Sequence, residues 1–261
     1  MKLSPSIFIP SGLTLAAITV GLLLGLAFPT PGVASFGWVA PGLLAFLLIH
    51  GENLFKTKAG SDSNHNTTSI CAFKLGWLAG FSFWLLTLRW LLLMPFPGGA
   101  ILGWLSLSAY LACYLGFWSW LLHKVGRKMP LFRFSLFAAS AWGSLEWVRG
   151  WLFSGFAWNM LGVSQHDNIP LAQLASWTGV YGISFLMVAF SISWIMGGYD
   201  WISALKSSHP LKEDTRERFM GVFSTRYFKE GAFWLLILCL LIGWGSHSVS
   251  KKSLKNPAQD Q

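Results

Sequence analysis

Seven long apolar runs constrain the fold of this 261-residue chain more than any other feature. They cover residues 11–28, 33–49, 72–94, 100–123, 133–153, 171–197 and 231–246. A helix needs about 20 apolar residues to cross a bilayer, and the longer runs reach that length. Charged residues make up only 11% of the sequence and hydrophobic residues 54%, whereas about 25% of an ordinary soluble domain is charged. The sequence therefore predicts an all-α, polytopic integral membrane protein with about seven transmembrane helices.

The basic residues predict the orientation of these helices. Between the spans they are Lys56 and Lys58, then Lys124, Arg127, Lys128 and Arg133, then Lys206, Lys212, Arg216, Arg218, Arg226 and Lys229. The loops after the first, third and fifth spans contain no Lys or Arg. The positive-inside rule then predicts a cytoplasmic N-terminus and a periplasmic C-terminus. The formal charge of +9 is explained by this topology, and no nucleic-acid partner is predicted.

Three charged residues lie well inside the apolar runs, at least four positions from either end. Glu146 and Arg149 are three residues apart in the fifth run, so they share one face of a helix, and Arg89 lies in the third run. An unpaired charge inside a membrane is costly, which makes all three candidate site residues. We expect them at one depth in the outer leaflet, where the surplus guanidinium can bind a lipid phosphate. The alternative is an ion-pair network that joins the third and fifth spans, with the Arg89 side chain reaching the interface.

Aromatic residues surround this charged pair. Trp147, Trp151 and Trp158 suit the membrane–water boundary, where tryptophan is enriched. They are predicted either to anchor the fifth span at the interface or to line an acyl-chain slot beside Arg149. Gln165, in the following loop, is predicted either to pack within the loop or to line a substrate entrance.

Four motifs carry a resemblance to a known family. They are Glu146-Trp-Val-Arg-Gly-Trp, Ser154-Gly-Phe-Ala-Trp158, Gly162-Val-Ser-Gln165 and Gly179-Val-Tyr-Gly-Ile-Ser-Phe185. In order and spacing they resemble the membrane domain of apolipoprotein N-acyltransferases, as do Arg89-Trp90 and the seven-span layout. Ala157 departs from the pattern, because the family usually has proline before this tryptophan.

The resemblance implies an enzyme of the bacterial inner membrane. Such an enzyme transfers an acyl chain from a phospholipid to the N-terminal S-diacylglyceryl-cysteine of a lipoprotein. In the family, a periplasmic nitrilase-like domain carries the Glu–Lys–Cys triad that supplies the nucleophile, base and oxyanion stabiliser. We therefore expect residues 1–250 to form the membrane domain and residues 251–261 to begin a linker to a nitrilase-like domain that is missing or separately encoded.

This chain alone is accordingly predicted to be catalytically inactive, with its catalytic domain supplied in cis or in trans. The cysteines are poor substitutes for the triad, because Cys113 and Cys239 lie in apolar runs and Cys71 at a predicted cytoplasmic boundary. No cofactor or metal site is predicted.

Two other classes of protein remain open. The domain could be a non-catalytic membrane anchor for a polyprenol-phosphate glycosyltransferase. A small transporter is the other alternative, although transporters usually place charged sites near the midplane between two repeated halves.

Overall fold

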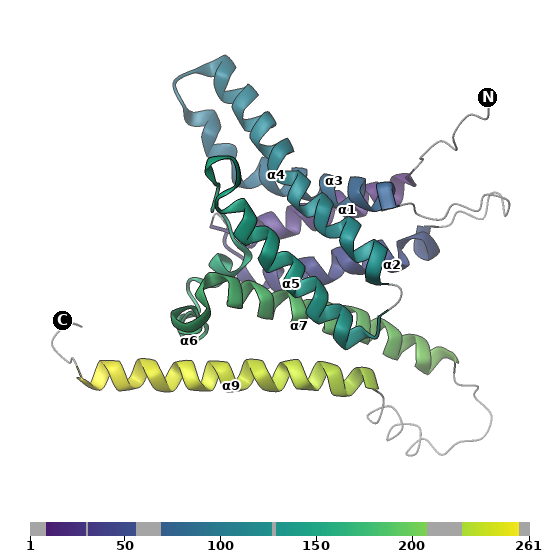
Figure 1. Cartoon of the computed structure of the whole chain (residues 1–261), viewed down its shortest axis with the longest axis vertical. Helices are drawn as coiled ribbons and strands as arrows, with labels where there is room; N and C mark the ends of the chain where they lie inside the picture. Colours follow the sequence, from purple (N-terminus) through teal and green to yellow (C-terminus); the bar gives the residue numbers. More distant parts are fainter. Residues whose placement is uncertain (1–8, 30, 56–68, 127–128, 208–225, 256–261) are drawn as a thin grey trace. The chain divides into compact units, whose positions relative to one another are not determined.

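The computed structural model describes residues 9–29, 31–55, 69–126, 129–207 and 226–255. Within these ranges every regular element is an α-helix or a 3₁₀ helix, which confirms the all-α prediction. The chain divides into two compact units (Figure 1). Unit 1 consists of Met1–Phe36 and Leu43–Met129, and unit 2 consists of Gly37–Gly42 and Pro130–Gln261.

Each of the seven apolar runs overlaps an α-helix. The α-helices are α1 (Ser11–Leu26), α2 (Ala40–Phe55), α3 (Ser69–Thr87), α4 (Pro97–Gly126), α5 (Leu131–Arg149), α6 (Ile169–Ala172), α7 (Ala175–Ser207) and α9 (Arg226–Lys255). Four 3₁₀ helices join them: η1 (Ala34–Trp38), η2 (Arg89–Leu93), η3 (Leu152–Ser154) and η4 (Leu161–Gln165). Among the described residues, 5 helices are long and apolar enough to cross a membrane. The chain is therefore a multi-pass membrane protein, while the count of seven spans and the orientation stay predictions.

Small residues determine how the helices of unit 1 pack. Gly21 and Gly25 of α1 face α3, where a Cβ at Gly21 would overlap the Ala79 carbonyl. The Ser82 hydroxyl of α3 donates to the Ile18 carbonyl of α1 at 3.1 Å. Such close backbone approach is the usual means of helix association in membranes, where lipid offers no hydrophobic driving force.

The α3–α4 pair repeats this arrangement. A Cβ at Gly76 would overlap the Ser119 side chain, and one at Gly80 would lie 3.0 Å from Ala112 Cα. Two indoles hydrogen-bond across the seam, Trp77 to the Ala109 carbonyl and Trp104 to the Leu85 carbonyl, both at 3.1 Å. Since later residues of α3 pair with earlier residues of α4, the two helices are antiparallel.

Replacement of Gly76 by alanine is expected to destabilise unit 1 by about 1–3 kcal/mol, because overpacking forces neighbouring groups apart. Gly103 of α4 is the matched control, since a Cβ there meets nothing within 4 Å. Thermal unfolding of the purified protein in detergent measures both changes. A Gly76→Ala melting temperature equal to that of Gly103→Ala would contradict the tight α3–α4 seam.

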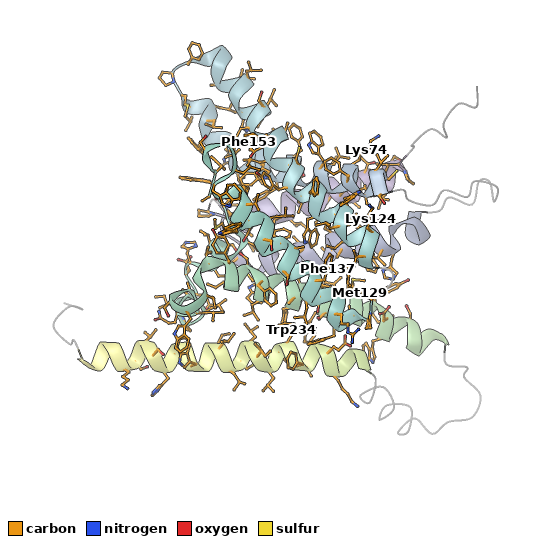
Figure 2. The ribbon with its side chains drawn as sticks, in the orientation of Figure 1. Lys74, Lys124, Met129, Phe137, Phe153 and Trp234 are labelled. Atoms are coloured by element: carbon orange, nitrogen blue, oxygen red, sulfur yellow. The ribbon has the colours of Figure 1, made fainter. Side chains whose placement is uncertain are left out.

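In unit 2, α7 packs against α5 and α9, and α9 also contacts α6. A Cβ at Gly245 of α9 would overlap the Pro170 carbonyl of α6. Trp177 and Trp244 stack edge to face with centroids 5.9 Å apart. Trp234 points from α9 toward the rest of its unit, where it contacts Phe185 (Figure 2). These contacts leave α5 and the start of α7 side by side, where the charged pair lies.

Candidate functional site

Glu146 organises a buried polar centre in the last turns of α5. Its side chain is only 6% exposed. Oε1 accepts a hydrogen bond from Trp142 Nε1 at 2.9 Å and another from the Leu161 backbone N–H at 2.7 Å. The first donor is four residues earlier on the same helix face, and the second is 15 residues further along the chain. The carboxylate therefore holds the backbone at Leu161 against the end of α5.

Arg149, one helical turn after Glu146, binds the segment that precedes Leu161. Its guanidinium is buried, with the side chain 4% exposed, and Nη1 donates to the Trp158 carbonyl at 2.7 Å. The Phe156 N–H in turn donates to the Arg149 carbonyl at 2.8 Å. Arg149 also interacts electrostatically with Glu146, which compensates part of the cost of burying each charge.

The segment held in this way, residues 150–160, is named the outer loop. Its backbone turns sharply, because Phe153, Ser154 and Gly155 have φ angles of 51°, 68° and 76° in succession. Two non-glycine residues in the left-handed region are uncommon and energetically unfavourable. A Cβ at Gly155 would overlap the Gly150 carbonyl, so the loop also passes very close to the end of α5.

Besides α5 and the outer loop, helix α7 contributes residues to the polar centre. Helix geometry breaks at Gly179, whose φ is 65°. Beyond the break, the Ser184 hydroxyl accepts the Gly162 N–H at 2.9 Å, next to the Leu161 N–H that donates to Glu146. A Cβ at Gly162 would lie 2.6 Å from the Val180 carbonyl. The third and fourth sequence motifs thus meet beside the Leu161 N–H that donates to Glu146.

Trp142 and Ser184 were not among the predicted site residues. The signal for Trp142 was its spacing, since a residue four positions before Glu146 shares its helix face. Ser184 lies within the last of the quoted motifs, but only the fold brings it to Gly162.

The other predicted residues of unit 2 separate into two groups. Gln165 is 5% exposed and donates to the Ser164 hydroxyl at 3.0 Å, which favours packing within the loop. Trp147, Trp151 and Trp158 are 56%, 55% and 54% exposed, and the first two stack edge to face. Both predicted roles of these indoles, as interfacial anchors and as an acyl-chain lining, require exposed rings.

The apolar run predicted Arg89 within the third span, but α3 ends before it, and whether Arg89 lies in the membrane stays a prediction. Helix α3 ends at Thr87, and Arg89 is the first residue of η2, with an exposed side chain. The apolar run continues through this change of backbone geometry, so hydrophobicity could not locate the end of the helix. Arg89 belongs to unit 1 and the Glu146–Arg149 centre to unit 2, and the placement of all three charges at one depth stays a prediction.

Cys113 and Cys239 are exposed on apolar helices, and Cys71 is buried. No group of three or more His, Cys, Asp and Glu side chains suited to a metal ion occurs among the described residues.

Fold and site together define a polytopic helical membrane domain with a buried carboxylate–guanidinium centre at the end of α5. The sequence model of the apolipoprotein N-acyltransferase N-terminal domain matches residues 20–193, which include that centre. The chain therefore belongs to the apolipoprotein N-acyltransferase family.

Individual relatives agree with this assignment. The apolipoprotein N-acyltransferase of Geobacter metallireducens is 32% identical over 186 residues, which is 68% of this chain and 32% of that protein. Those of Methylococcus capsulatus and Caulobacter vibrioides are 32% and 31% identical over 185 and 181 residues. These matches cover 68% and 67% of this chain and 33% and 31% of the relatives. The chain thus spans about a third of the length of each.

Proposed function

We propose that this chain is the membrane part of an apolipoprotein N-acyltransferase in a bacterial inner membrane. The enzyme would transfer an acyl chain from a phospholipid to the N-terminal S-diacylglyceryl-cysteine of a lipoprotein. The observation that carries the proposal is the family match over residues 20–193, because it contains α5, the outer loop and the start of α7 as one stretch. The named relatives are acyltransferases, so the anchor and transporter hypotheses gain no support from them.

Within this function, Glu146 and Arg149 are positioning residues. Their hydrogen bonds to Trp158 and Leu161 hold the last part of the outer loop and the start of η4 against α5. That arrangement keeps Trp147, Trp151 and Trp158 exposed, where they can contact the interfacial part of a lipid. A phosphate-binding role for Arg149 requires that its bond to the Trp158 carbonyl be exchanged for the lipid, because only 4% of the side chain is exposed.

Acyl transfer itself would be performed by a nitrilase-like domain, in cis or in trans. The reaction needs an activated thiolate, and Cys113 and Cys239 lie on apolar helices where thiolate formation is unfavourable. We therefore propose that residues 1–261 bind and orient the lipid substrates and do not turn them over without that domain.

Tagging the protein at its own locus tests this proposal. An immunoblot and affinity purification in mild detergent should yield either a chain near 29.0 kDa with a separate nitrilase-like protein or one longer polypeptide that contains such a domain. Recovery of a glycosyltransferase, with no nitrilase-like domain in either form, would contradict it and would favour the anchor hypothesis.

A further inference from the structure

The outer loop combines several unfavourable backbone conformations. Non-glycine residues with a positive φ occur among the described residues only at Phe153, Ser154 and Asn159, where φ is 51°, 68° and 46°. Asparagine tolerates this left-handed conformation, but it is unfavourable for phenylalanine and serine. Such strain persists only where neighbouring contacts enforce it, and it is concentrated at ligand clamps and switch regions. Release of the loop from α5 would therefore relieve strain.

Only part of the apolar surface of the loop is buried, so little burial opposes such a release. Its largest side chains, Trp151, Phe153 and Trp158, are 55%, 79% and 54% exposed. Hydrophobic stabilisation is proportional to the apolar area removed from water, and these rings leave more than half of theirs uncovered. Hydrogen bonds tie the loop to α5 instead. The Phe156 N–H donates to the Arg149 carbonyl, and the Arg149 guanidinium donates to the Trp158 carbonyl.

The position of the loop determines whether the Arg149 guanidinium is accessible. In the present arrangement the side chain is 4% exposed, and Nη1 lies 2.7 Å from the Trp158 carbonyl oxygen. If the loop leaves α5, that acceptor leaves with it and Nη1 faces the space that the loop occupied. Glu146 lies on the same helix, so it stays near Arg149 and keeps the guanidinium in place. A guanidinium fixed in this way is suited to bind a phosphate through paired, charge-assisted hydrogen bonds.

We propose that the outer loop is a lid, shut in this structure, and that its opening exposes Arg149 to a phosphate group. Strain at Phe153 and Ser154 lowers the free energy needed to open the lid. Exchange of the Trp158 carbonyl for a phosphate oxygen replaces the hydrogen bond that opening breaks. The inference rests on the proposed function, in which a substrate carries such a phosphate, and it adds a control of access to Arg149.

Chemical modification of arginine tests the lid. Phenylglyoxal modifies accessible guanidinium groups, and mass spectrometry of the protein in detergent measures its rate at Arg149 and at the exposed Arg89, which is the internal reference. Ser154 is exposed, so its replacement alters backbone preference with little effect on packing. Ser154→Gly removes strain and should slow modification of Arg149 about threefold, whereas the β-branched Ser154→Val adds strain and should speed it about threefold. The rate at Arg89 should stay the same in both variants.

Equal rates at Arg149 in the three proteins would overturn the lid. Ser154→Gly keeps the test decisive if Ser154→Val loses its fold, because unfolding cannot make modification slower. Equal rates together with copurification of a nitrilase-like domain would mean that the lid is wrong and the proposed function stands. Rates in the predicted order without such a domain would support the lid and contradict the proposed function.

The phosphate ligand is tested in Ser154→Val, in which the lid is expected to be open more often. Dioctanoyl phosphatidylglycerol and inorganic phosphate are added separately before phenylglyoxal. Slower modification of Arg149, but not of Arg89, with the lipid alone would assign the site to a lipid headgroup. The same protection by inorganic phosphate would assign it to free phosphate. No protection by either would overturn the phosphate site.

Discussion

Replacement of Glu146 by alanine is expected to destabilise unit 2 by about 3–5 kcal/mol, because it leaves a buried charge without its partner. The Arg149 guanidinium would lose the Glu146 charge, and the N–H groups of Trp142 and Leu161 would lose their acceptor. The melting temperature in detergent measures the loss of stability. Protease cleavage between residues 150 and 160 reports release of the outer loop.

Two further variants separate the charge from the hydrogen bonds. Glu146→Gln keeps an oxygen that can accept from Leu161, so it should cost less than Glu146→Ala. Arg149→Met removes the opposing charge, and the double change of Glu146→Ala with Arg149→Met should cost less than the sum of the two single changes. Strict additivity would show that the two charged groups do not act as a unit.

Gly155→Ala is the second change with a large expected effect. The glycine has a φ of 76°, and a Cβ would overlap the Gly150 carbonyl, which is backbone and cannot rotate away. We expect the outer loop to leave α5 and the hydrogen bond from the Phe156 N–H to the Arg149 carbonyl to be lost, at a cost of about 2–4 kcal/mol from strain and overlap together.

Gly32→Ala separates these two causes. Gly32 has a similar φ of 72°, but a Cβ there would have only ordinary contact with Pro29, at 3.8 Å. The Gly32→Ala variant should lose about 1 kcal/mol of folding stability, from backbone strain alone. Protease cleavage of the outer loop should rise in Gly155→Ala and stay at the level of the unmodified protein in Gly32→Ala. Equal behaviour of the two variants would mean that the close approach to α5 contributes nothing.

Hydrophobic pattern was sufficient to predict the helices, because each apolar run must be helical to satisfy its backbone in lipid. It could not predict where α3 ends. The residues after Thr87 are as apolar as those before it, and the change to a 3₁₀ helix at Arg89 depends on backbone angles rather than on composition. That change places Arg89 after the end of α3, with an exposed side chain.

The candidate site was likewise predictable from the sequence only in part. The rarity of charge in apolar runs predicted Glu146 and Arg149, and helix spacing predicted that they lie together. Their strongest partners, the Leu161 N–H and the Trp158 carbonyl, are backbone groups of a loop. Any residue type supplies such groups, so only the folded path of the outer loop reveals them.

Transfer of an acyl group by a chimera tests the central claim most directly. Residues 1–250 of this chain would replace the matching membrane domain of the Geobacter metallireducens enzyme, which retains its own remaining part. In phospholipid vesicles, mass spectrometry of the N-terminal lipopeptide follows conversion of a diacyl lipoprotein into the triacyl form. We predict conversion by the chimera and its loss in the chimera with Glu146→Ala. A folded, membrane-inserted chimera that leaves the lipoprotein in the diacyl form would contradict the claim that this chain is the membrane part of an N-acyltransferase.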